Sequence, residues 1–301
     1  MKILYAARHN NGGNEDEAAI AYALRELGHT VHCVGEEVTG GAAAGYDFTL
    51  YNKPMNLDPA MGLHGRKVMY FFDLVQHPDF ELGPQTAQRV RWMEHVRHIF
   101  DLVFLTDGDC AARHPDRFVH LMQGADERVI GPGKASRVVN NEPFRILFTG
   151  GTMHGEGRRT FAEQLKEHYR GRFLHIGDKR QPKLYGRKLA NLMATMKIVV
   201  CPDTPVTDVY WSNRVYQATG YGAFVLHPRC ALLETQYEDG KEIVFYDNRD
   251  HLFELIDAYL SPVNDGERCR IAAAGLERVK REHLYRHRCE QLVAEVQRRL
   301  P

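Results

Sequence analysis

The sequence predicts an α/β protein built from two doubly wound domains, in which helices cover parallel sheets. Short apolar runs alternate with stretches of helical periodicity, and this alternation favours parallel sheets because a helix can carry each crossover. A glycine loop follows the first apolar run of each half, as at the start of a nucleotide-binding unit. The 301 residues are long for one core and suit two domains. We therefore expect two such domains facing one cleft.

The first half opens with a strand, a loop and a helix. Residues 2–7 form an apolar strand, and the helix that begins at Glu15 has acidic residues in its first turn. A second strand follows over 30–34. The loop between the first strand and the helix carries Gly12 and Gly13 without the GxGxxG pattern, so a dinucleotide site is not expected. These two glycines either let the backbone approach a ligand or simply form the turn.

An apolar strand over 67–72 is followed by two candidate acid–base residues. Asp73 comes directly after the strand and His77 four residues later. Ligands collect at the carboxyl ends of strands in open α/β sheets, so both side chains stand where proton transfer would be useful. A loop carboxylate in this position is more often a helix cap. The other elements expected in this half are strands over 47–51, 101–105 and 118–121 and a helix over 84–100.

A polar stretch over 130–143 marks the boundary between the halves, because a fresh strand begins beyond it. We expect a first Rossmann-like domain over 1–140, a second over 141–285, and a C-terminal helix over 286–301 that can pack back on the first domain. The elements expected in the second domain are strands over 145–149, 172–176, 197–201, 223–226 and 242–246 and helices over 158–169, 184–196, 251–260 and 265–281.

Residues 210–226 read as a helix start, a short amphipathic helix and a glycine-marked turn into a buried strand. Ser212 or Asn213 can cap the helix, and the exposed amides of its first turn, together with the helix dipole, would form a seat for an anion. Arg214 adds a cation close to that seat. The alternative is an ordinary capped helix with a solvated arginine.

Composition and charge exclude several classes of protein. The chain is 44% hydrophobic and 26% charged, as is usual for a soluble globular protein, and its 39 basic and 39 acidic residues cancel. Nothing global therefore attracts it to nucleic acid or anionic lipid. It contains no apolar run long enough to span a membrane, and its first residues lead directly into a strand instead of a signal peptide. We expect a cytoplasmic protein without membrane insertion.

The cysteines and histidines show no metal-binding pattern. The six cysteines are scattered, and the 16 histidines form no His-x-x-x-His pair with a nearby carboxylate pattern. We expect mostly reduced, structural cysteines and no protein-bound metal.

The second half resembles the C-terminal domain of group-1-type glycosyltransferases of the GT-B architecture, and within that group the spore-maturation-type branch. The resemblance covers roughly residues 145–290 and rests on three ordered segments. These are 185–200 (YGRKLANLMATMKIVV), 212–226 (SNRVYQATGYGAFVL) and 232–247 (LLETQYEDGKEIVFYD). The first half resembles the acceptor domain of these enzymes only in plan, with a glycine loop after the first strand and a helix ending in Gly-His.

The resemblance implies transfer of a sugar from a nucleoside-diphosphate sugar, such as a UDP-sugar, to a hydroxyl acceptor, without a metal or another cofactor. The second domain would hold the donor, and the first, with Gly12 and Gly13, the acceptor. A diphosphate needs fixed positive partial charges, which glycine-loop amides, a helix terminus and an arginine can supply. The candidate donor-binding residues are Gly150, Gly151, Arg158, Arg180, Ser212, Asn213, Arg214 and Gln217. Arg158 and Arg180, like Arg159 and Lys179, follow the carboxyl ends of strands, but a single residue of this kind is more often a solvated charge than a ligand contact.

The sequence departs from the family pattern at two positions. Relatives usually carry a glutamate where this chain has Gln217, and that glutamate would accept hydrogen bonds from the donor ribose. Glutamine still offers a carbonyl acceptor. Retaining relatives place a further glutamate eight residues earlier, where this chain has Val209 beside Asp208. The stereochemical outcome is therefore open. An inverting enzyme would need a base, for which Asp73 or His77 is the candidate, whereas a retaining enzyme would not.

Other functions remain as alternatives. A sugar-nucleotide epimerase or a phosphorylase could use the same two-domain plan, although an epimerase would need an acid–base set that the sequence does not supply. The substitution at Gln217 gives some weight to a catalytically inactive nucleotide-sugar-binding protein. The acceptor could be a glycan, a small molecule, a protein or a modified nucleic-acid base. The balanced charge speaks against long nucleic acid.

Overall fold

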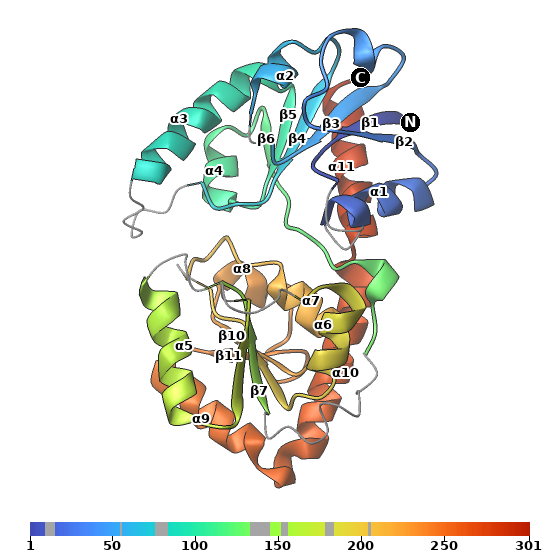
Figure 1. Cartoon of the computed structure of the whole chain (residues 1–301). Helices are drawn as coiled ribbons and strands as arrows, with labels where there is room; N and C mark the ends of the chain where they lie inside the picture. Colours follow the sequence, from blue (N-terminus) through green and yellow to red (C-terminus); the bar gives the residue numbers. More distant parts are fainter. Residues whose placement is uncertain are drawn as a thin grey trace. The chain divides into compact units, whose positions relative to one another are not determined.

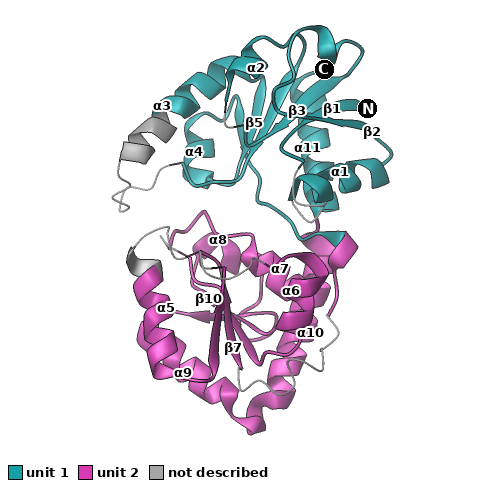
Figure 2. Ribbon diagram, viewed as in Figure 1, with its two compact units in different colours: residues 1–127, 285–301 teal, residues 128–284 magenta. Residues whose placement is uncertain are grey.

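A computed structural model shows the chain as two compact units (Figures 1 and 2). Unit 1 comprises residues 1–127 and 285–301, and unit 2 comprises residues 128–284. The sequence places the first boundary at residue 140, whereas the structure divides the chain after Glu127. The residues that the structure describes are 1–9, 16–54, 56–75, 84–132, 145–151, 156–177, 184–203 and 206–301, with side chains from Arg91 in the helix starting at Pro84 and from Arg159 in the helix starting at Glu156.

Unit 1 contains a six-stranded parallel sheet in the order β2-β1-β3-β4-β5-β6. The strands are β1 (Lys2–Ala6), β2 (Thr30–Val34), β3 (Phe48–Asn52), β4 (Lys67–Phe71), β5 (Leu102–Leu105) and β6 (Phe118–His120). The near-continuous apolar sequences of β1, β3, β4 and β5 are those of strands buried on both faces, whereas the edge strand β2 is largely exposed. The expected α/β class is therefore confirmed for this half.

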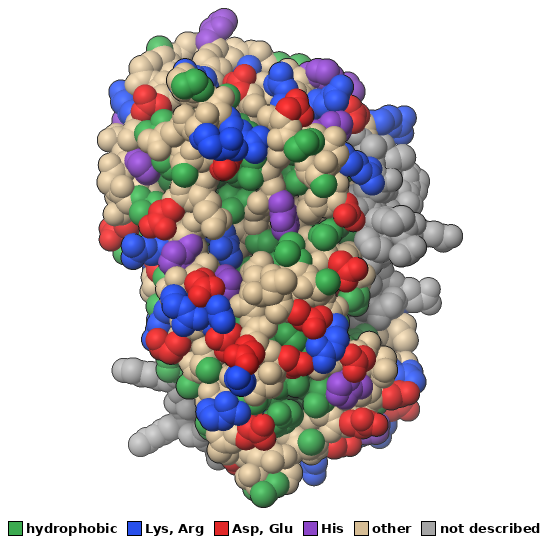
Figure 3. Space-filling view, turned by 180° about the vertical axis from the view of Figure 1, so that it is seen from behind, with side chains coloured by type: hydrophobic (Ala, Val, Ile, Leu, Met, Phe, Trp, Pro, Cys, Tyr) green, Lys and Arg blue, Asp and Glu red, His purple; other side chains and the backbone are tan. Residues whose placement is uncertain are grey.

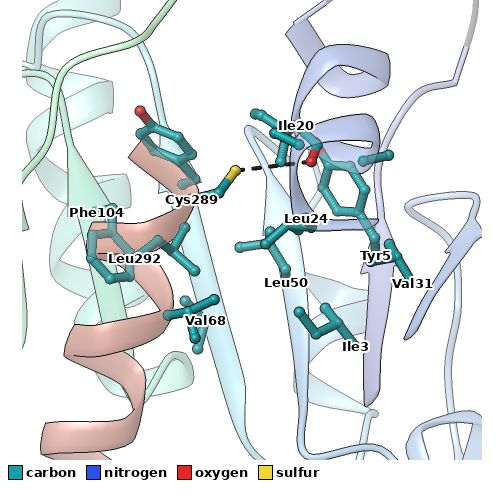
Figure 4. Packing of buried hydrophobic residues seen from close by; sticks show 14 of the residues in the cluster. Ile3, Tyr5, Ile20, Leu24, Val31, Leu50, Val68, Phe104, Cys289 and Leu292 are labelled. Carbon is teal, nitrogen blue, oxygen red and sulfur yellow. Dashed lines mark hydrogen bonds between the residues drawn. The ribbon is translucent and has the colours of Figure 1, made fainter. Parts of the chain in front are cut away.

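Helices cover both faces of the sheet in unit 1. Helices α1 (Asp16–Glu26) and α11 (Tyr285–Arg299) pack on one face, and α2 (Asp58–Met61), α3 (Pro84–Ile99) and α4 (Gly108–Arg113) contribute to the core on the other. Figure 4 shows the first core, where Ile20 and Leu24 from α1 and Cys289 and Leu292 from α11 meet side chains of the strands. The last helix of the chain thus belongs to the core of unit 1.

Unit 2 contains a five-stranded parallel sheet in the order β11-β10-β9-β7-β8. The strands are β7 (Ile146–Thr149), β8 (Phe173–Ile176), β9 (Ile198–Val200), β10 (Val225–Pro228) and β11 (Val244–Tyr246), and the helices are α5 (Glu156–His168), α6 (Gly186–Met193), α7 (Arg214–Gly220), α8 (Ala231–Glu234), α9 (Arg249–Leu260) and α10 (Asp265–Glu282). One face of the sheet forms a core with α5 and α9, to which Ile271 of α10 also contributes.

Each sheet has a point at which the strand order reverses. In unit 1 the reversal lies between β1 and β3, and in unit 2 it lies between β7 and β9. Two loops leave such a point in opposite directions, so the carboxyl ends of the two strands leave room for a ligand. Functional residues are therefore expected after β1 and β3 and after β7 and β9.

The surface mixes both signs of charge. On the face seen in Figure 3, Lys and Arg side chains lie among Asp and Glu side chains over unit 2 instead of forming a patch of one sign. Several of these residues are ion-paired, such as Arg278, which lies 2.9 Å from carboxylate oxygens of both Glu242 and Glu282. Within the described ranges, no helix combines the length and the hydrophobicity needed to cross a membrane.

Candidate functional site

Two glycines shape the backbone at the reversal point of unit 2. Gly150 follows β7 with φ 142°, and its N–H donates to the carbonyl of Ile176 over 2.8 Å. Gly177 follows the neighbouring strand β8 with φ 107°, and a Cβ at Gly177 would lie 3.0 Å from the nitrogen of Gly150. Both positions combine a left-handed backbone with a close approach of two chain segments, which only glycine accommodates without strain.

Arg214 points its guanidinium at this glycine turn. A Cβ at Gly150 would lie 2.6 Å from Nη2 of Arg214, while Nη1 donates to the carbonyl of Pro202 over 3.2 Å. The Cζ atom lies 5.5 Å from the centre of the Phe148 ring, within the range of a cation–π contact. The half-buried guanidinium is therefore held between the ends of β7 and β9, unlike the solvated arginine of the alternative interpretation.

Arg214 also differs from other arginines of unit 2 in its partners. Arg229, Arg268 and Arg278 each lie close to at least one carboxylate. Within the part of unit 2 that the structure describes, no carboxylate oxygen lies within 4.0 Å of the Arg214 guanidinium. A guanidinium has five N–H donors, and a half-buried one whose hydrogen-bond acceptor is a neutral carbonyl is suited to bind an anion.

The start of α7 differs from the expected anion seat. Asn213 precedes the helix with helical backbone angles (φ −51°, ψ −16°), and its side chain makes no capping hydrogen bond. A capping side chain needs an extended backbone to reach the amides of the first turn, so Asn213 is in the wrong conformation. Ser212 Oγ accepts from the Arg214 N–H, but over a long 3.4 Å. The Ser212 N–H itself is already bonded to Asp203.

Asp203 and His227 form a buried pair beside this helix start. The Asp203 carboxylate accepts from the Ser212 N–H, with N–O distances of 3.2 and 3.3 Å. His227 lies on β10, and its Nε2 is 3.0 Å from Oδ2 of Asp203 while its Nδ1 is 2.7 Å from the carbonyl oxygen of Pro228. The two side chains are 4% and 1% exposed. The sequence patterns did not single out either residue, although both sit at the carboxyl ends of adjacent strands.

Buried groups around the pair stay uncharged. Burial raises the pKa of the Cys201 thiol to about 12, in spite of the opposing effect of Arg214. Burial likewise raises the pKa of the Tyr246 hydroxyl well above its ordinary value, and the Asp203 carboxylate raises it further. Neither group therefore supplies an anion that could compete for Arg214 at neutral pH.

Of the other predicted donor-binding residues, some lie in the described part of unit 2 and some lie outside it. Gln217 is half-buried in α7, and Gly151 follows Gly150 at the end of β7. Arg158 belongs to α5, but its side chain lies outside the described part. Arg180 also lies outside the described residues. The structure thus brings together Gly150, Ser212, Asn213 and Arg214 and leaves the two further arginines as predictions.

The candidate base Asp73 is paired with a lysine in unit 1. Its two carboxylate oxygens lie 2.8 and 2.7 Å from Nζ of Lys53, and each of the two side chains is 30% exposed. Lys53 follows β3 with φ 46°, and no other non-glycine residue in the described ranges has a positive φ. Left-handed backbone at such a residue is strained and concentrates at functional sites. His77, Gly12 and Gly13 lie outside the described residues.

Asp16 is a second unusual carboxyl group of unit 1. It opens α1 directly after the predicted glycine loop, and its Oδ2 accepts from Gln123 Nε2 over 2.8 Å. Burial raises its pKa to about 6, and the nearby Glu17 and Asp126 act in the same direction, whereas hydrogen bonds from Tyr285 and Gln123 oppose the rise. The sequence indicated only an acidic first helical turn, which is common at helix starts.

The chain is similar in sequence to one protein family and similar in structure to several solved proteins. The sequence model of a family described as glycosyl transferase-like matches residues 157–294. A sucrose-phosphate synthase from Thermosynechococcus elongatus has a similar structure, with a TM-score of 0.68 at 12% identity over 99% of this chain and 98% of that one. The Anabaena protein HepE in complex with UDP-glucose gives 0.65 at 13% over 100% of both chains.

A third solved structure, an α1,3-fucosyltransferase with GDP-fucose, gives a TM-score of 0.54 at 15% identity over 100% of this chain and 90% of that one. No curated protein matches the sequence significantly. At these identities the solved structures show the fold alone. Together with the family match, which includes Asp203, Arg214 and His227, they confirm the GT-B fold and the predicted resemblance to group-1-type glycosyltransferases.

Proposed function

We propose that this chain, which has the GT-B fold and matches the model of a glycosyl transferase-like family over residues 157–294, moves a sugar from a nucleoside-diphosphate sugar to a hydroxyl group of an acceptor. The observation that carries the proposal is the Arg214 guanidinium, half-buried beside Gly150 at the reversal point of the sheet. HepE and the fucosyltransferase contain nucleotide sugars in their solved structures, which supports a donor of the same chemical class.

The proposed chemistry needs positive charge at the leaving group. When the bond between the sugar and the diphosphate breaks, negative charge builds up on the diphosphate oxygens. A fixed guanidinium in a partly desolvated place stabilises that charge more in the transition state than in the ground state, and so lowers the barrier. We propose that Arg214 has this role, with Arg158 and Arg180 completing the site, and that no metal ion is required.

Gln217 is the proposed contact to the donor ribose. It lies three residues after Arg214 in α7, and this spacing places the two side chains on the same face of the helix. An amide can accept from one ribose hydroxyl through its carbonyl, where a glutamate could accept from two. We therefore propose weaker ribose binding than in relatives with glutamate at this place.

Asp73 is the proposed base on the acceptor side, for a reaction that inverts the configuration. Lys53 holds the carboxylate in one position through contacts to both of its oxygens. The carboxylate would accept the proton of the acceptor hydroxyl as the new glycosidic bond forms. The proposed acceptor carries a hydroxyl group and is a glycan, a small molecule, a protein or a modified nucleic-acid base.

We also propose a reducing compartment, such as the cytoplasm, and the six cysteines, which form no disulfide bonds, support this.

The decisive experiment is calorimetric titration of nucleoside diphosphates into the protein and into the Arg214→Ala variant. A hydrogen bond to a charged group contributes about 1.5–3 kcal/mol, so we expect affinity for UDP or GDP to fall by about 10- to 150-fold. The matched control is Arg187→Ala, which removes an exposed arginine of the same unit whose bonds to the carbonyls of Gly131 and Ile130 are 3.4 Å long. Equal affinity in the wild type and the Arg214→Ala variant would remove Arg214 from the site.

The role of Asp73 needs a separate assay. We expect Asp73→Asn to keep the donor affinity of the wild type while slowing transfer by about 10²- to 10⁴-fold, because general-base catalysis contributes in this range. Radiolabelled donor with a panel of acceptors gives the transfer rate, and slow hydrolysis of the donor gives an activity that needs no acceptor. Full transfer activity in Asp73→Asn would withdraw the assignment as base.

An inactive nucleotide-sugar binder is the second candidate, because Gln217 stands where active relatives carry glutamate. Labelled donor distinguishes the two. Binding without transfer to any acceptor and without hydrolysis would favour the binder, and restoration of turnover by Gln217→Glu would show that this one position separates the two functions.

A further inference from the structure

We propose that Asp203 and His227 are positioning residues of the donor site, which hold Arg214 where it can grip the diphosphate. The inference rests on the proposed donor role of Arg214 and adds two residues to it. Neither residue needs to touch the donor. Asp203 contacts the backbone just before Arg214, and His227 lies on the strand that follows α7.

The segment Pro202–Asp203 contacts the start of α7 at two points. The Pro202 carbonyl accepts from Nη1 of Arg214 over 3.2 Å. The next residue, Asp203, accepts from the backbone N–H of Ser212, two residues before Arg214, over 3.2 and 3.3 Å. One short segment after β9 therefore fixes both the backbone that carries Arg214 and the far end of its side chain. A shift of this segment would displace the guanidinium.

His227 anchors this segment to the sheet. It lies on β10, which pairs in parallel with β9, and its Nε2 is 3.0 Å from Oδ2 of Asp203. Its Nδ1 is 2.7 Å from the Pro228 carbonyl oxygen, and this hydrogen bond restricts rotation of the ring. The His227 ring also meets Phe245 of β11 edge-on, with 6.2 Å between ring centres. The position of Asp203 is thus set by two adjacent strands of the core.

Stability alone is a poor reason for such a pair. Desolvation of two polar or charged side chains costs free energy that their attraction often fails to recover, and apolar replacements of similar volume are frequently as stable. Here the pair lies beside a segment that contacts Arg214, and the partners of the Asp203 carboxylate are the Ser212 N–H and His227 instead of that guanidinium. The Arg214 charge is left for a ligand, as a positioning role requires.

A double-mutant cycle tests the proposal. Asp203→Asn and His227→Gln are each made alone and together with Arg214→Ala, and calorimetry measures the affinity for UDP and for uridine, or for GDP and guanosine if the protein prefers guanine. We expect each single variant to weaken diphosphate binding by about 3- to 30-fold, as for residues in contact. Together with Arg214→Ala, the added loss should be less than about twofold. Nucleoside affinity should not change, because it does not depend on Arg214.

The control is Glu242→Gln, which removes a carboxylate that lies 2.9 Å from Arg278 in the same unit. It should lower the thermal midpoint and leave diphosphate affinity at the wild-type value. Circular dichroism confirms that each variant is folded, and His227→Gln keeps the test decisive if Asp203→Asn does not fold.

The possible outcomes separate the two proposals. If Arg214→Ala keeps the wild-type affinity for the nucleoside diphosphate, Arg214 does not bind the donor, and the positioning role of Asp203 and His227 is wrong as well. If Arg214→Ala loses affinity while the Asp203 and His227 variants either keep it or add their full loss to that of Arg214→Ala, the donor role stands and the positioning role is wrong. Loss of nucleoside binding in the Asp203 and His227 variants would also overturn it, because it would indicate general damage to the site.

Discussion

Asp16 in unit 1 and Asp203 in unit 2 occupy comparable places and have different surroundings. Each follows a strand near the carboxyl edge of its sheet, Asp16 after the loop that leaves β1 and Asp203 directly after β9. Asp16 accepts a hydrogen bond from the neutral Gln123 amide and has acidic neighbours in Glu17 and Asp126. Asp203 accepts from a backbone amide and lies against His227.

The comparison indicates that the surroundings of a desolvated carboxyl group determine whether it titrates near neutral pH or holds neighbouring segments in place. Burial, together with the nearby negative charges of Glu17 and Asp126, raises the pKa of Asp16 to about 6 against the opposing hydrogen bonds, so its charge changes within the physiological range. The partners of Asp203 instead connect it to a helix start and a strand, so the group links two parts of the structure. One carboxyl is set up to titrate, and the other is set up to position a neighbour.

The largest expected effect is on the free energy of unfolding when the titrating carboxyl group of Asp16 is removed. A pKa raised from 3.8 in the unfolded chain to about 6 in the folded one means that the folded state binds the proton more tightly. Ionisation of Asp16 therefore does not destabilise the folded state below the unfolded pKa. The loss in free energy of unfolding grows as the pH rises from about 4 to about 6 and reaches its full value above pH 6. The shift corresponds to about 3 kcal/mol, which screening of the half-buried side chain reduces to about 2 kcal/mol.

Asp16→Asn removes the titration and keeps an acceptor for Gln123. The variant should match the wild type near pH 4 and exceed its free energy of unfolding by about 2 kcal/mol near pH 8. Urea unfolding of both proteins across this range measures the difference. Glu17→Gln removes one of the negative charges that raise the Asp16 pKa, so it should give a pH-dependent gain of the same sign but smaller than that of Asp16→Asn. Parallel stability curves for wild type and Asp16→Asn would contradict the prediction.

Much of the fold could be predicted because the strands are apolar runs of characteristic length. The strand expected over 30–34 coincides with β2, and that over 47–51 is shifted by one residue from β3. Short helices such as α2, α4 and α8 were not expected, since four to six residues are too few to show a helical period. The helix expected over 184–196 was too long, because it ends at Met193 and the next residues form a turn.

The site could be predicted only where a single residue carries the signal. Gly150 and Arg214 were both expected near the donor, and the structure places them together. The pairing of Asp203 with His227 could not be read from the sequence, since 24 positions separate them and only the pairing of β9 with β10 brings them close. Similarly, nothing in the sequence near Asp73 indicates Lys53, which reaches it from the neighbouring strand β3.

A second prediction tests whether the segment containing Asp203 holds Arg214 against Gly150. If Pro202 and Asp203 hold Arg214 against Gly150, a methyl group at position 150 must displace the guanidinium, since a Cβ there would lie 2.6 Å from Nη2. Gly150→Ala should cost about 1–2 kcal/mol of stability through backbone strain and should also weaken diphosphate binding. Gly171→Ala is the matched control, because Gly171 has φ 76° and a Cβ there would have no neighbour within 4 Å. It should cost similar stability and leave affinity intact; loss of affinity in both variants would show that backbone strain alone explains it.

The smallest expected effect concerns an exposed counterpart of the buried pair. Arg229 lies 2.7 to 2.8 Å from carboxylate oxygens of Asp247, Glu234 and Asp239 at the same edge of unit 2, and its side chain is 40% exposed. Its hydrogen bond holds the pKa of Asp247 below the ordinary value. Water and salt screen such contacts, so breaking these three exposed ion pairs should cost less free energy of unfolding than removing one partner of the buried pair at Asp203.

Arg229→Gln should therefore lower the free energy of unfolding by about 1 kcal/mol or less at low salt, and the loss should shrink towards zero near 1 M salt. Asp203→Asn in the same urea titrations should cost more, and its cost should respond less to salt, because its partners are shielded from solvent. If Arg229→Gln proved the more damaging of the two, the number of charge contacts would outweigh burial at this edge of the sheet. The expectation that burial makes the Asp203–His227 pair more costly to break than exposed ion pairs would then be wrong.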